Sequence, residues 1–529
     1  MTLQKSLRQN PPHRASIVFA LFATVATSLL ATPAVHAQPA ESNVRERPAG
    51  NRGGRPAEQA QPANEVRSEV RPLPADRTTT HRVDINGKTT EFTATAGTIR
   101  LNDLESGRPI ADISYIAFQL AGADKRTRPV TFAFNGGPGY ASGWLNLGAL
   151  GPWRLRMDAD AAFPTADPAP LDNNESWLEF TDLVFIDPAG TGYSRVIGGE
   201  DVRRRLWSVD GDISSLATTI RRWTEANGRS FSPKYIAGES YGGFRAPKIA
   251  HQLTTDQGVS VNGLVLISPV LDFRRFNARN SPLSLAAGLP SMAATALERK
   301  GTIERSSLKA VEDYARGSFV TDLMRGLKDA DALARLTRNV SEFTGLDVDL
   351  VARRNGRITT STFAAETARA NGKIASLYDG AVLGLDPFPG SPRPEADDQM
   401  RLGLHAPITQ AMVDMFHNRL GWNVENGRYF FINDQASRSW NWGNRQQEAV
   451  NDLSQSLALD PRLRVLIAHG LTDLVTPYFE TQMVLDQMAQ IGPSERLRFE
   501  VYPGGHMFYA RDESRRRFRD AARAMMAAP

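Results

Sequence analysis

The sequence predicts an α/β fold in which a mostly parallel sheet is flanked by helices. Short apolar runs with the character of buried strands alternate with stretches in which apolar residues recur at helical spacing. The runs in the first half of the chain lie at 130–134, 183–187, 234–238 and 263–268. Strands return late in the chain, with a buried run at 464–468 and an alternating run at 497–501. Strands that alternate with helices in this way are typical of βαβ units and a parallel sheet.

An Asn-Gly turn and a long helical stretch add two features to this plan. Asn86-Gly87 predicts a β-hairpin at the start of the ordered chain. Between about 276 and 440 the strand pattern stops and helical patterns take over, which predicts an inserted cap above the sheet. The expected organisation is a signal peptide over 1–37, a disordered linker over 38–80, a first core part over 81–275, a mostly helical cap over 276–440, and a second core part over 441–529.

The N-terminal segment has the pattern of an export signal. Basic residues precede an apolar stretch at 15–31, and Val35-His36-Ala37 supplies small residues at the cleavage positions. A membrane anchor is the alternative, but the apolar stretch is barely long enough and is interrupted by hydroxyl residues. We expect cleavage after Ala37, no stable membrane anchor afterwards, and export to a bacterial periplasm or to the medium. The Pro- and Arg-rich segment that follows has too few apolar residues to fold.

The composition excludes some partners. Of the 529 residues, 41% are hydrophobic, which is ample for a large core. The formal net charge is only +4, and basic and aromatic residues do not alternate as on a nucleic-acid surface, so we expect no nucleic-acid partner. Asp and His spacings typical of metal ligands are absent, so we expect no metal and no cofactor. The chain has no cysteine, so its stability must come from burial alone.

The segment Gly238-Glu239-Ser240-Tyr241-Gly242-Gly243 is the most informative motif. It follows a short strand-like run at 234–237 and precedes a helical stretch at 244–253. A Gly-x-Ser-x-Gly on a strand-to-helix turn is the nucleophile elbow of α/β hydrolases. The glycines are needed because side chains next to the serine would collide in so tight a turn. The hydroxyl of Ser240 would then lie near a helix N-terminus, which favours negative charge. A chance Gly-x-Ser-x-Gly in a loop is the alternative.

A serine nucleophile needs a base and an acid, which in this fold follow it in the order Ser, Asp or Glu, His. Among the eight histidines, His506 fits because it follows the strand at 497–501 on a Pro-Gly-Gly turn. Asp473 lies beyond the strand at 464–468, where catalytic groups gather in α/β sheets, and would orient the imidazole. The alternatives are a structural histidine and an aspartate that caps the next helix. The capping role is compatible with the catalytic one.

The glycine-rich loop after the strand at 130–134 predicts an oxyanion hole. Asn135-Gly136-Gly137-Pro138-Gly139 follows this strand at once. We expect the backbone N–H groups of Gly137 and Tyr241 to bind the oxyanion, because glycine lets the backbone approach a carbonyl oxygen closely. A phosphate-binding loop is the rival interpretation, but no Gly-Lys-Ser/Thr follows.

Taken together, these motifs resemble the serine carboxypeptidase family. The family's oxyanion loop, elbow, late aspartate loop and Gly-His-Met stand here as Asn135–Gly139, Gly238–Gly243, Gly470–Asp473 and Gly505–Met507. A fifth stretch, 174–194, is similar to the family's Ser-Trp…Asp-Gln-Pro…Gly-Phe-Ser segment. The resemblance covers the chain from about residue 81 to the end. It implies removal of the C-terminal residue from peptide substrates by way of an acyl-enzyme.

The resemblance also implies how the substrate is held. Asn135 and Glu239 match residues that share hydrogen bonds with the substrate's terminal carboxylate. A glutamate can bind a carboxylate only if one of the two holds a proton, so its pKa must be raised and activity should favour acidic pH. The alternative is that Glu239 is an incidental elbow residue.

The sequence departs from the family pattern at several places. Ala149 stands where the family has a second acid, and Tyr140-Ala141-Ser142 replaces Cys-Ser-Ser. The triad and oxyanion loop would equally serve a capped esterase or an acyl transferase, and a catalytically silent binding protein is a third possibility. Trp440 and Trp442 could line the substrate site, although tryptophans more often pack in the interior.

Overall fold

The structure is a computed structural model that describes residues 71–157, 168–276, 281–301, 303–391, 397–443 and 447–527. The expected signal peptide at 1–37 and the linker up to residue 70 lie outside the described residues. Among the helices that are described, none combines the length and the apolar character needed to cross a bilayer.

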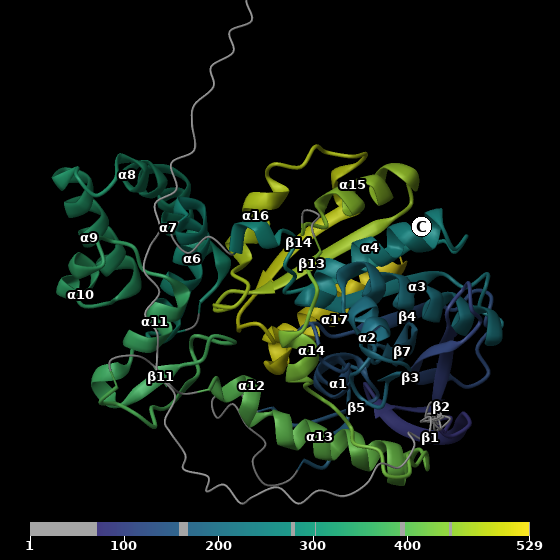
Figure 1. The fold of residues 1–529 in the computed structure, drawn as a ribbon. Coiled ribbons are helices and arrows are strands. Elements are labelled where there is room, and N and C mark those ends of the chain that lie inside the picture. The colour runs from purple at the N-terminus through teal and green to yellow at the C-terminus, as the bar shows by residue number, and fades with distance from the viewer. Residues whose placement is uncertain are drawn as a thin grey trace, which may run out of the picture. The chain divides into compact units, whose positions relative to one another are not determined.

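A ten-stranded sheet forms the centre of the described chain (Figure 1). Its strands are β1 (Arg77–Ile85), β2 (Lys88–Asn102), β3 (Pro109–Leu120), β4 (Val130–Phe134), β7 (Asp182–Ile186), β8 (Arg195–Val196), β9 (Lys234–Glu239), β10 (Gly263–Ile267), β13 (Arg464–Gly470) and β14 (Leu497–Tyr502). The order is β1-β2-β3-β7-β4-β9-β10-β13-β14, with β8 paired to β3. From β7 to β14 all neighbours are parallel, whereas β1, β2 and β3 pair antiparallel. The predicted mostly parallel sheet is confirmed.

The N-terminal hairpin turns at Asn86-Gly87, as the sequence predicted. Both residues have positive φ, 52° and 73°, which a two-residue hairpin turn of this kind requires. The strand β1 begins at Arg77, so the linker predicted to extend to residue 80 ends earlier than expected. The physical reason is anchoring just upstream of β1, where Asp76 accepts a hydrogen bond of 2.6 Å from the Tyr115 hydroxyl.

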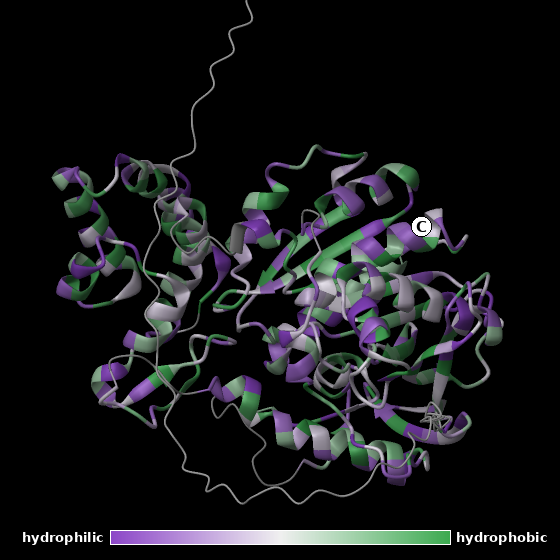
Figure 2. Cartoon of the chain, viewed as in Figure 1, coloured by the Kyte–Doolittle hydropathy of each residue, from purple (hydrophilic) through white to green (hydrophobic). Residues whose placement is uncertain are grey.

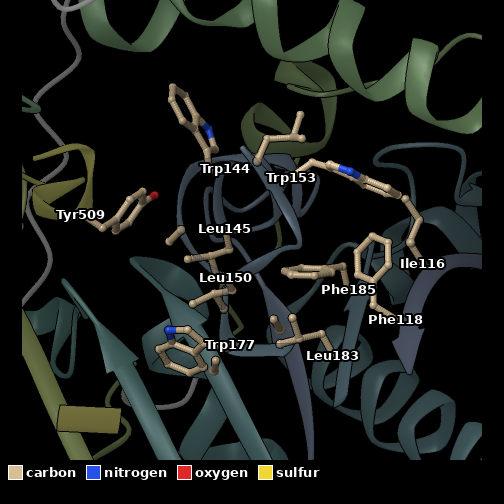
Figure 3. Close-up of a cluster of buried hydrophobic side chains, with 14 of the residues drawn as sticks. Ile116, Phe118, Trp144, Leu145, Leu150, Trp153, Trp177, Leu183, Phe185 and Tyr509 are labelled. Carbon is tan, nitrogen blue, oxygen red and sulfur yellow. The ribbon is translucent and has the colours of Figure 1, made fainter. Parts of the chain in front are cut away.

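Helices cover both faces of the sheet, which explains why the central strands are apolar without alternation. On one face, α3 (Val209–Ala226), α4 (Tyr241–Thr255) and α15 (Val450–Leu459) pack on residues such as Ile236 and Leu266. The opposite face meets α17 (Asp512–Ala527) and an aromatic cluster, with Ala237 and Val265 facing that side. Figure 2 shows the apolar central strands beside helices of mixed polarity, and Figure 3 shows part of the aromatic cluster.

The predicted cap region is largely helical and packs in two groups. The first comprises α6 (Pro282–Glu298), α7 (Lys309–Tyr314), α8 (Val320–Arg325), α9 (Ala330–Thr344), α10 (Val348–Arg353) and α11 (Thr360–Glu366). It has an apolar cluster of its own and rests on α16 (Tyr478–Leu485), as Figure 1 also shows. The second comprises α12 (Gln399–Gly403), α13 (His405–Asp414) and α14 (Asp434–Arg438). The helices α12 and α13 of this second group pack into the aromatic cluster of the main core.

Shorter elements complete the described chain. A small antiparallel pair, β11 (Lys373–Ala375) and β12 (Leu383–Leu385), joins the two groups of the cap and was not predicted, because three-residue strands carry no readable periodicity. The remaining short elements are α1 (Gly143–Leu145), β5 (Trp153–Arg154), β6 (Leu171–Asp172), α2 (Glu200–Leu206) and α5 (Phe273–Phe276). Single turns of 3₁₀ or π type lie at 146–150, 177–179, 305–308, 315–319, 369–371, 415–419, 494–496 and 508–510.

Candidate active site

Ser240 lies on the turn between β9 and α4, at the carboxyl ends of the central strands. Its backbone has φ 60° and ψ −122°, a conformation that costs a non-glycine residue on the order of 1–3 kcal/mol. The turn holds it there, because the Ser240 N–H donates to the Ile267 carbonyl of β10 at 2.9 Å. A Cβ added at Gly238 would lie 2.1 Å from the Gly242 carbonyl oxygen, so only glycine fits at that position. The elbow therefore has the steep geometry that the motif predicted.

His506 and Asp473 come from the loops after β14 and β13 and meet as a pair. The Nδ1 atom of His506 lies 2.8 Å from Oδ2 of Asp473, and both side chains are buried. The other carboxylate oxygen of Asp473 accepts the backbone N–H groups of Val475 and Thr476, at 2.9 and 2.8 Å. Asp473 thus orients the imidazole and holds its own loop at the same time. Burial lowers the pKa of His506, but the facing carboxylate outweighs it, so the pKa lies above its usual value.

His469 shows what a structural histidine looks like in this fold. It is fully buried, and its Nε2 atom lies 2.9 Å from the Thr481 hydroxyl. Burial, reinforced by His506, lowers its pKa to about 3, so it stays neutral at working pH. Within the part of the chain that the structure describes, no carboxylate pairs with it as Asp473 pairs with His506.

Ser240 and His506 open into one small cavity of about 100 Å³. The cavity is also lined by Asn135, Gly137 and Glu239, so five of the seven site residues expected from sequence meet there. The other two, Asp473 and Tyr241, are not among the residues that line it.

The glycine-rich loop at 135–139, which the sequence analysis expects to bind the oxyanion, lies against the elbow. A Cβ at Gly136 would lie 2.5 Å from the Tyr241 amide nitrogen and 2.7 Å from the Glu239 carbonyl oxygen, so glycine permits this contact. Gly137, with φ of 102°, continues the loop along the cavity.

The ring of Tyr241 turns into the interior, where Trp440 and Trp442 pack edge-on at centroid distances of 5.6 and 5.8 Å. Neither tryptophan lines the cavity, and both pack behind the elbow. The guanidinium of Arg245 lies over the Tyr241 ring at 4.7 Å, pairs with Asp212 and donates to the Asn135 carbonyl at 3.1 Å. Arg245 thereby ties the elbow helix to the oxyanion loop.

Asn135 and Glu239 form a direct pair inside the cavity. The Nδ2 atom of Asn135 donates to Oε2 of Glu239 at 2.7 Å, and the Asn135 side-chain oxygen accepts the Leu145 N–H at 3.1 Å. Burial raises the pKa of Glu239 to about 7, although His506 and the two hydrogen bonds it accepts act in the opposite direction. This is the direction that binding a carboxylate requires.

The structure adds site residues that the sequence analysis did not name. The Tyr509 hydroxyl donates to Oε2 of Glu239 at 2.8 Å. The ring of Tyr378 stands edge-on to His506 at 5.2 Å and lines the cavity, and the Thr476 hydroxyl donates to Oδ2 of Asp473 at 2.6 Å. Only Tyr509 carried a weak signal, since it lies close after Gly505-His506-Met507. Tyr378 reaches the site from the cap, which no sequence spacing shows.

Ala149, which replaces the second acid of the family pattern, is buried in the π-type turn at 146–150. Its carbonyl accepts a hydrogen bond of 2.9 Å from the Asn173 side chain, so the backbone is anchored while the methyl group offers no polar contact. Within the described residues, no group of three or more His, Cys, Asp or Glu side chains is arranged to hold a metal ion.

A larger cavity of about 490 Å³ lies where α6 and the segment 354–362 face the loop that carries Asp473. Val475 lines both this cavity and the small one, so the two adjoin. Hydroxyl groups and the side chains of Arg354, Arg357 and Glu480 contribute polar walls.

Comparison with known proteins gives one consistent family. Residues 111–506 match the family model described as serine carboxypeptidase. Serine carboxypeptidase-like 40 of Arabidopsis thaliana is 33% identical over 143 residues, which are 26% of this chain and 26% of that protein. The pheromone-processing carboxypeptidase KEX1 of Leptosphaeria maculans is 29% identical over 191 residues, 34% of this chain and 27% of that protein. These matches thus span about a quarter of the length of the curated relatives.

A solved structure supports the fold. The crystal structure of Kex1(Δ)p, a prohormone-processing carboxypeptidase from Saccharomyces cerevisiae, superposes with a TM-score of 0.53 at 15% identity. The superposition covers 81% of this chain and 91% of that one, which confirms the α/β-hydrolase architecture. Because the family model spans most of the chain and the matched residues include Asn135–Gly139, Ser240, Asp473 and His506, this protein belongs to the serine carboxypeptidase family.

Proposed function

We propose that this protein is a serine carboxypeptidase that hydrolyses the C-terminal peptide bond of peptide substrates. The observation that carries the proposal is the pairing of Asn135 with a buried Glu239 in the cavity that Ser240 and His506 also line. A triad alone supports any acyl transfer, whereas a neutral carboxyl beside the nucleophile is suited to a free terminal carboxylate.

The mechanism follows from the roles of the triad. The Ser240 oxygen attacks the scissile carbonyl carbon while Nε2 of neutral His506 takes the hydroxyl proton. Asp473 holds the other ring nitrogen at 2.8 Å and stabilises the imidazolium. The N–H groups of Gly137 and Tyr241 stabilise the oxyanion, each worth about 3 kcal/mol in such sites. The imidazolium then protonates the leaving amine, and water attacks the acyl-enzyme with His506 again as base.

Glu239 and Asn135 would select the substrate end. Neutral Glu239 donates a hydrogen bond to the terminal carboxylate, and Asn135 supports the glutamate through their own hydrogen bond. The adjoining larger cavity would receive the peptide on the N-terminal side of the scissile bond, beneath the helical cap at 276–440. Export after removal of residues 1–37, to a periplasm or the medium, completes the proposal, with residues 81–275 and 441–529 as the two parts of the core.

A capped esterase or acyl transferase is the second candidate, and Ala149 is the observation that favours it. Without the second acid, one fewer group holds a free carboxylate. Such an enzyme would use the same triad and oxyanion hole but would not require a free terminal carboxylate.

Two measurements separate these possibilities. A fluorophosphonate probe should label the wild type but not Ser240→Ala, because only an activated serine reacts; equal labelling of both would exclude the proposed nucleophile. A blocked dipeptide with a free C-terminus should be cleaved with a kcat/KM at least about 100-fold above that of its C-terminal amide, since the neutral amide accepts a weaker hydrogen bond from Glu239 than a carboxylate and places an N–H donor where the carboxylate has an acceptor. Equal rates on both substrates would favour the second candidate.

A further inference from the structure

Two hydrogen-bond donors converge on the same oxygen of Glu239. The Asn135 amide and the Tyr509 hydroxyl both donate to Oε2, at 2.7 and 2.8 Å. All three side chains are buried, so these bonds do not compete with bulk water. An oxygen that accepts two donors in a buried site is a poor place for a proton. When Glu239 is neutral, its proton therefore belongs on the other oxygen, Oε1.

Tyr509 is held in place independently of Glu239. It lies on the 3₁₀ turn at 508–510, and its backbone carbonyl accepts a hydrogen bond of 3.1 Å from Arg515. Its ring packs so closely on the turn at 146–150 that a Cβ at Gly148 would lie 2.9 Å from the ring edge. Figure 3 shows the Tyr509 ring turned toward the segment that carries Trp144 and Leu145. The Tyr509 ring thus packs on the same turn that carries Ala149, while its hydroxyl reaches Glu239.

The hydroxyl remains a donor over the whole working range. Burial, reinforced by Glu239, raises the pKa of Tyr509 well above its usual value. The other titratable groups that act on Glu239 are His506 and Asp473, on the loops after β14 and β13, and their effects on the glutamate have opposite signs. Tyr378, from the cap, acts on Tyr509.

We propose that Tyr509 is a positioning residue which, together with Asn135, confines the proton of Glu239 to Oε1 so that it is presented to the substrate's terminal carboxylate. The inference rests on the proposed carboxypeptidase function and specifies its recognition step. One proton, on one carboxyl group, then governs binding of the free C-terminus: a hydrogen bond forms from Oε1 to the substrate carboxylate, and no covalent bond changes.

The test compares Tyr509→Phe with the wild type on the blocked dipeptide and on its C-terminal amide. The matched control is Tyr478→Phe, because the Tyr478 hydroxyl is also buried and donates to a glutamate, Glu312, at 2.9 Å, but outside the small cavity. For Tyr509→Phe we expect KM for the free acid at pH 5–6 to rise about fivefold, the loss expected for one hydrogen bond of about 1 kcal/mol. We expect kcat, and the slow reaction of the amide, to change less than twofold.

The pH profile gives a second test, because a Tyr509 with a purely structural role would leave the pH dependence of kcat/KM unchanged. Removal of a donor to the ionised carboxylate raises the pKa of Glu239, so the alkaline limb of kcat/KM on the free acid should move upward by about 0.5–1 pH unit. The inference would be overturned if the alkaline limb of kcat/KM lay at the same pH in Tyr509→Phe and in the wild type. It would also be overturned if Tyr509→Phe lost equal activity on the free acid and on the amide. A wild type that does not distinguish acid from amide would overturn the proposed function itself, and this inference with it.

Fluorophosphonate labelling shows whether Tyr509→Phe folds into an active protein. If it does not, an infrared measurement that needs no substitution at Tyr509 still tests the inference. The carbonyl band of protonated Glu239 is the infrared band at pH 5 that the wild type shows and Glu239→Gln lacks. This band should lie at the low-wavenumber end of the range for protonated carboxyl groups, because its C=O accepts two hydrogen bonds. A band at the position of a carbonyl without hydrogen bonds would contradict the proposed placement of the proton.

Discussion

Asp473 uses its two oxygens for different purposes, and this division explains the order of the site. Oδ2 holds Nδ1 of His506 at 2.8 Å, and Oδ1 accepts two backbone N–H groups of its own loop. The Thr476 hydroxyl adds a third donor to the carboxylate. These donors hold the carboxylate beside the imidazole, and a carboxylate facing Nδ1 favours the tautomer of His506 with a proton on that nitrogen.

Asp473→Asn should therefore preserve the shape of the site and abolish most of its activity. An amide that donates toward Nδ1 would favour the tautomer in which Nε2 carries the proton and cannot act as a base, so kcat should fall by about 10⁴-fold. Steady-state kinetics on the blocked dipeptide measures the effect. An unchanged melting temperature would show that the fold survives, and a loss of less than about tenfold would mean that Asp473 serves the loop alone.

At the scale of elements, the site depends on close approaches between backbones. The turn from β9 to α4 has no room for a side chain at Gly238, where an added Cβ would lie 2.1 Å from a carbonyl oxygen of the next turn. The buried ion pair of Arg245 and Asp212 joins α4 to α3 at 2.9 Å. The elbow is thus fixed both from within the turn and from the neighbouring helix.

Gly238→Ala should destabilise the protein by about 3 kcal/mol or more, because a backbone atom cannot move aside as a flexible side chain can. Gly317→Ala is the matched control: that glycine lies in the helical turn at 315–319, and an added Cβ meets nothing within 4 Å. We expect it to stabilise by about 0.5–1 kcal/mol. Urea unfolding of both variants measures the difference, and similar effects at the two positions would refute the steric argument.

For the molecule as a whole, the buried carboxyl groups make stability depend on pH. Burial raises the pKa of Glu239 to about 7, and burial also raises that of Asp187 to about 7. Between about pH 4.5 and 7 the folded protein keeps protons that the unfolded chain has lost. These two groups therefore make the free energy of unfolding fall as pH rises through that window, by up to about 1.4 kcal/mol per pH unit each.

Glu239→Gln isolates one of these contributions. A neutral amide of the same shape imitates the protonated glutamate, so the variant should match the wild type within about 1 kcal/mol near pH 4.5. At pH 8 the variant should be more stable than the wild type by about 3 kcal/mol, because burying the ionised carboxylate of Glu239 then lowers the free energy of unfolding of the wild type. Denaturant unfolding at the two pH values measures this, and a constant difference between the proteins would show that Glu239 does not titrate as stated.

The sequence was sufficient for the features that depend on local steric rules. The elbow around Ser240 and the turn at Asn86-Gly87 are tight backbone arrangements that only certain residues permit, so their residues reveal them. The strands β4, β7, β9 and β10 are buried along their whole length, and their nearly continuous apolar runs stand out for that reason. The start of β1 was misjudged, because contacts of the preceding segment with distant residues do not show in its composition.

What the sequence by itself determined is the parallel sheet and the set of candidate catalytic residues: a serine, an aspartate and a histidine in hydrolase order, and a glycine-rich loop expected to bind an oxyanion. Only the tertiary structure decided which side chains surround Glu239. Tyr509 lies 270 residues from Glu239 along the chain, yet donates to the same oxygen as Asn135. The physical reason is range: steric rules act between neighbours in sequence, whereas a hydrogen bond between distant residues exists only after the core has packed them together.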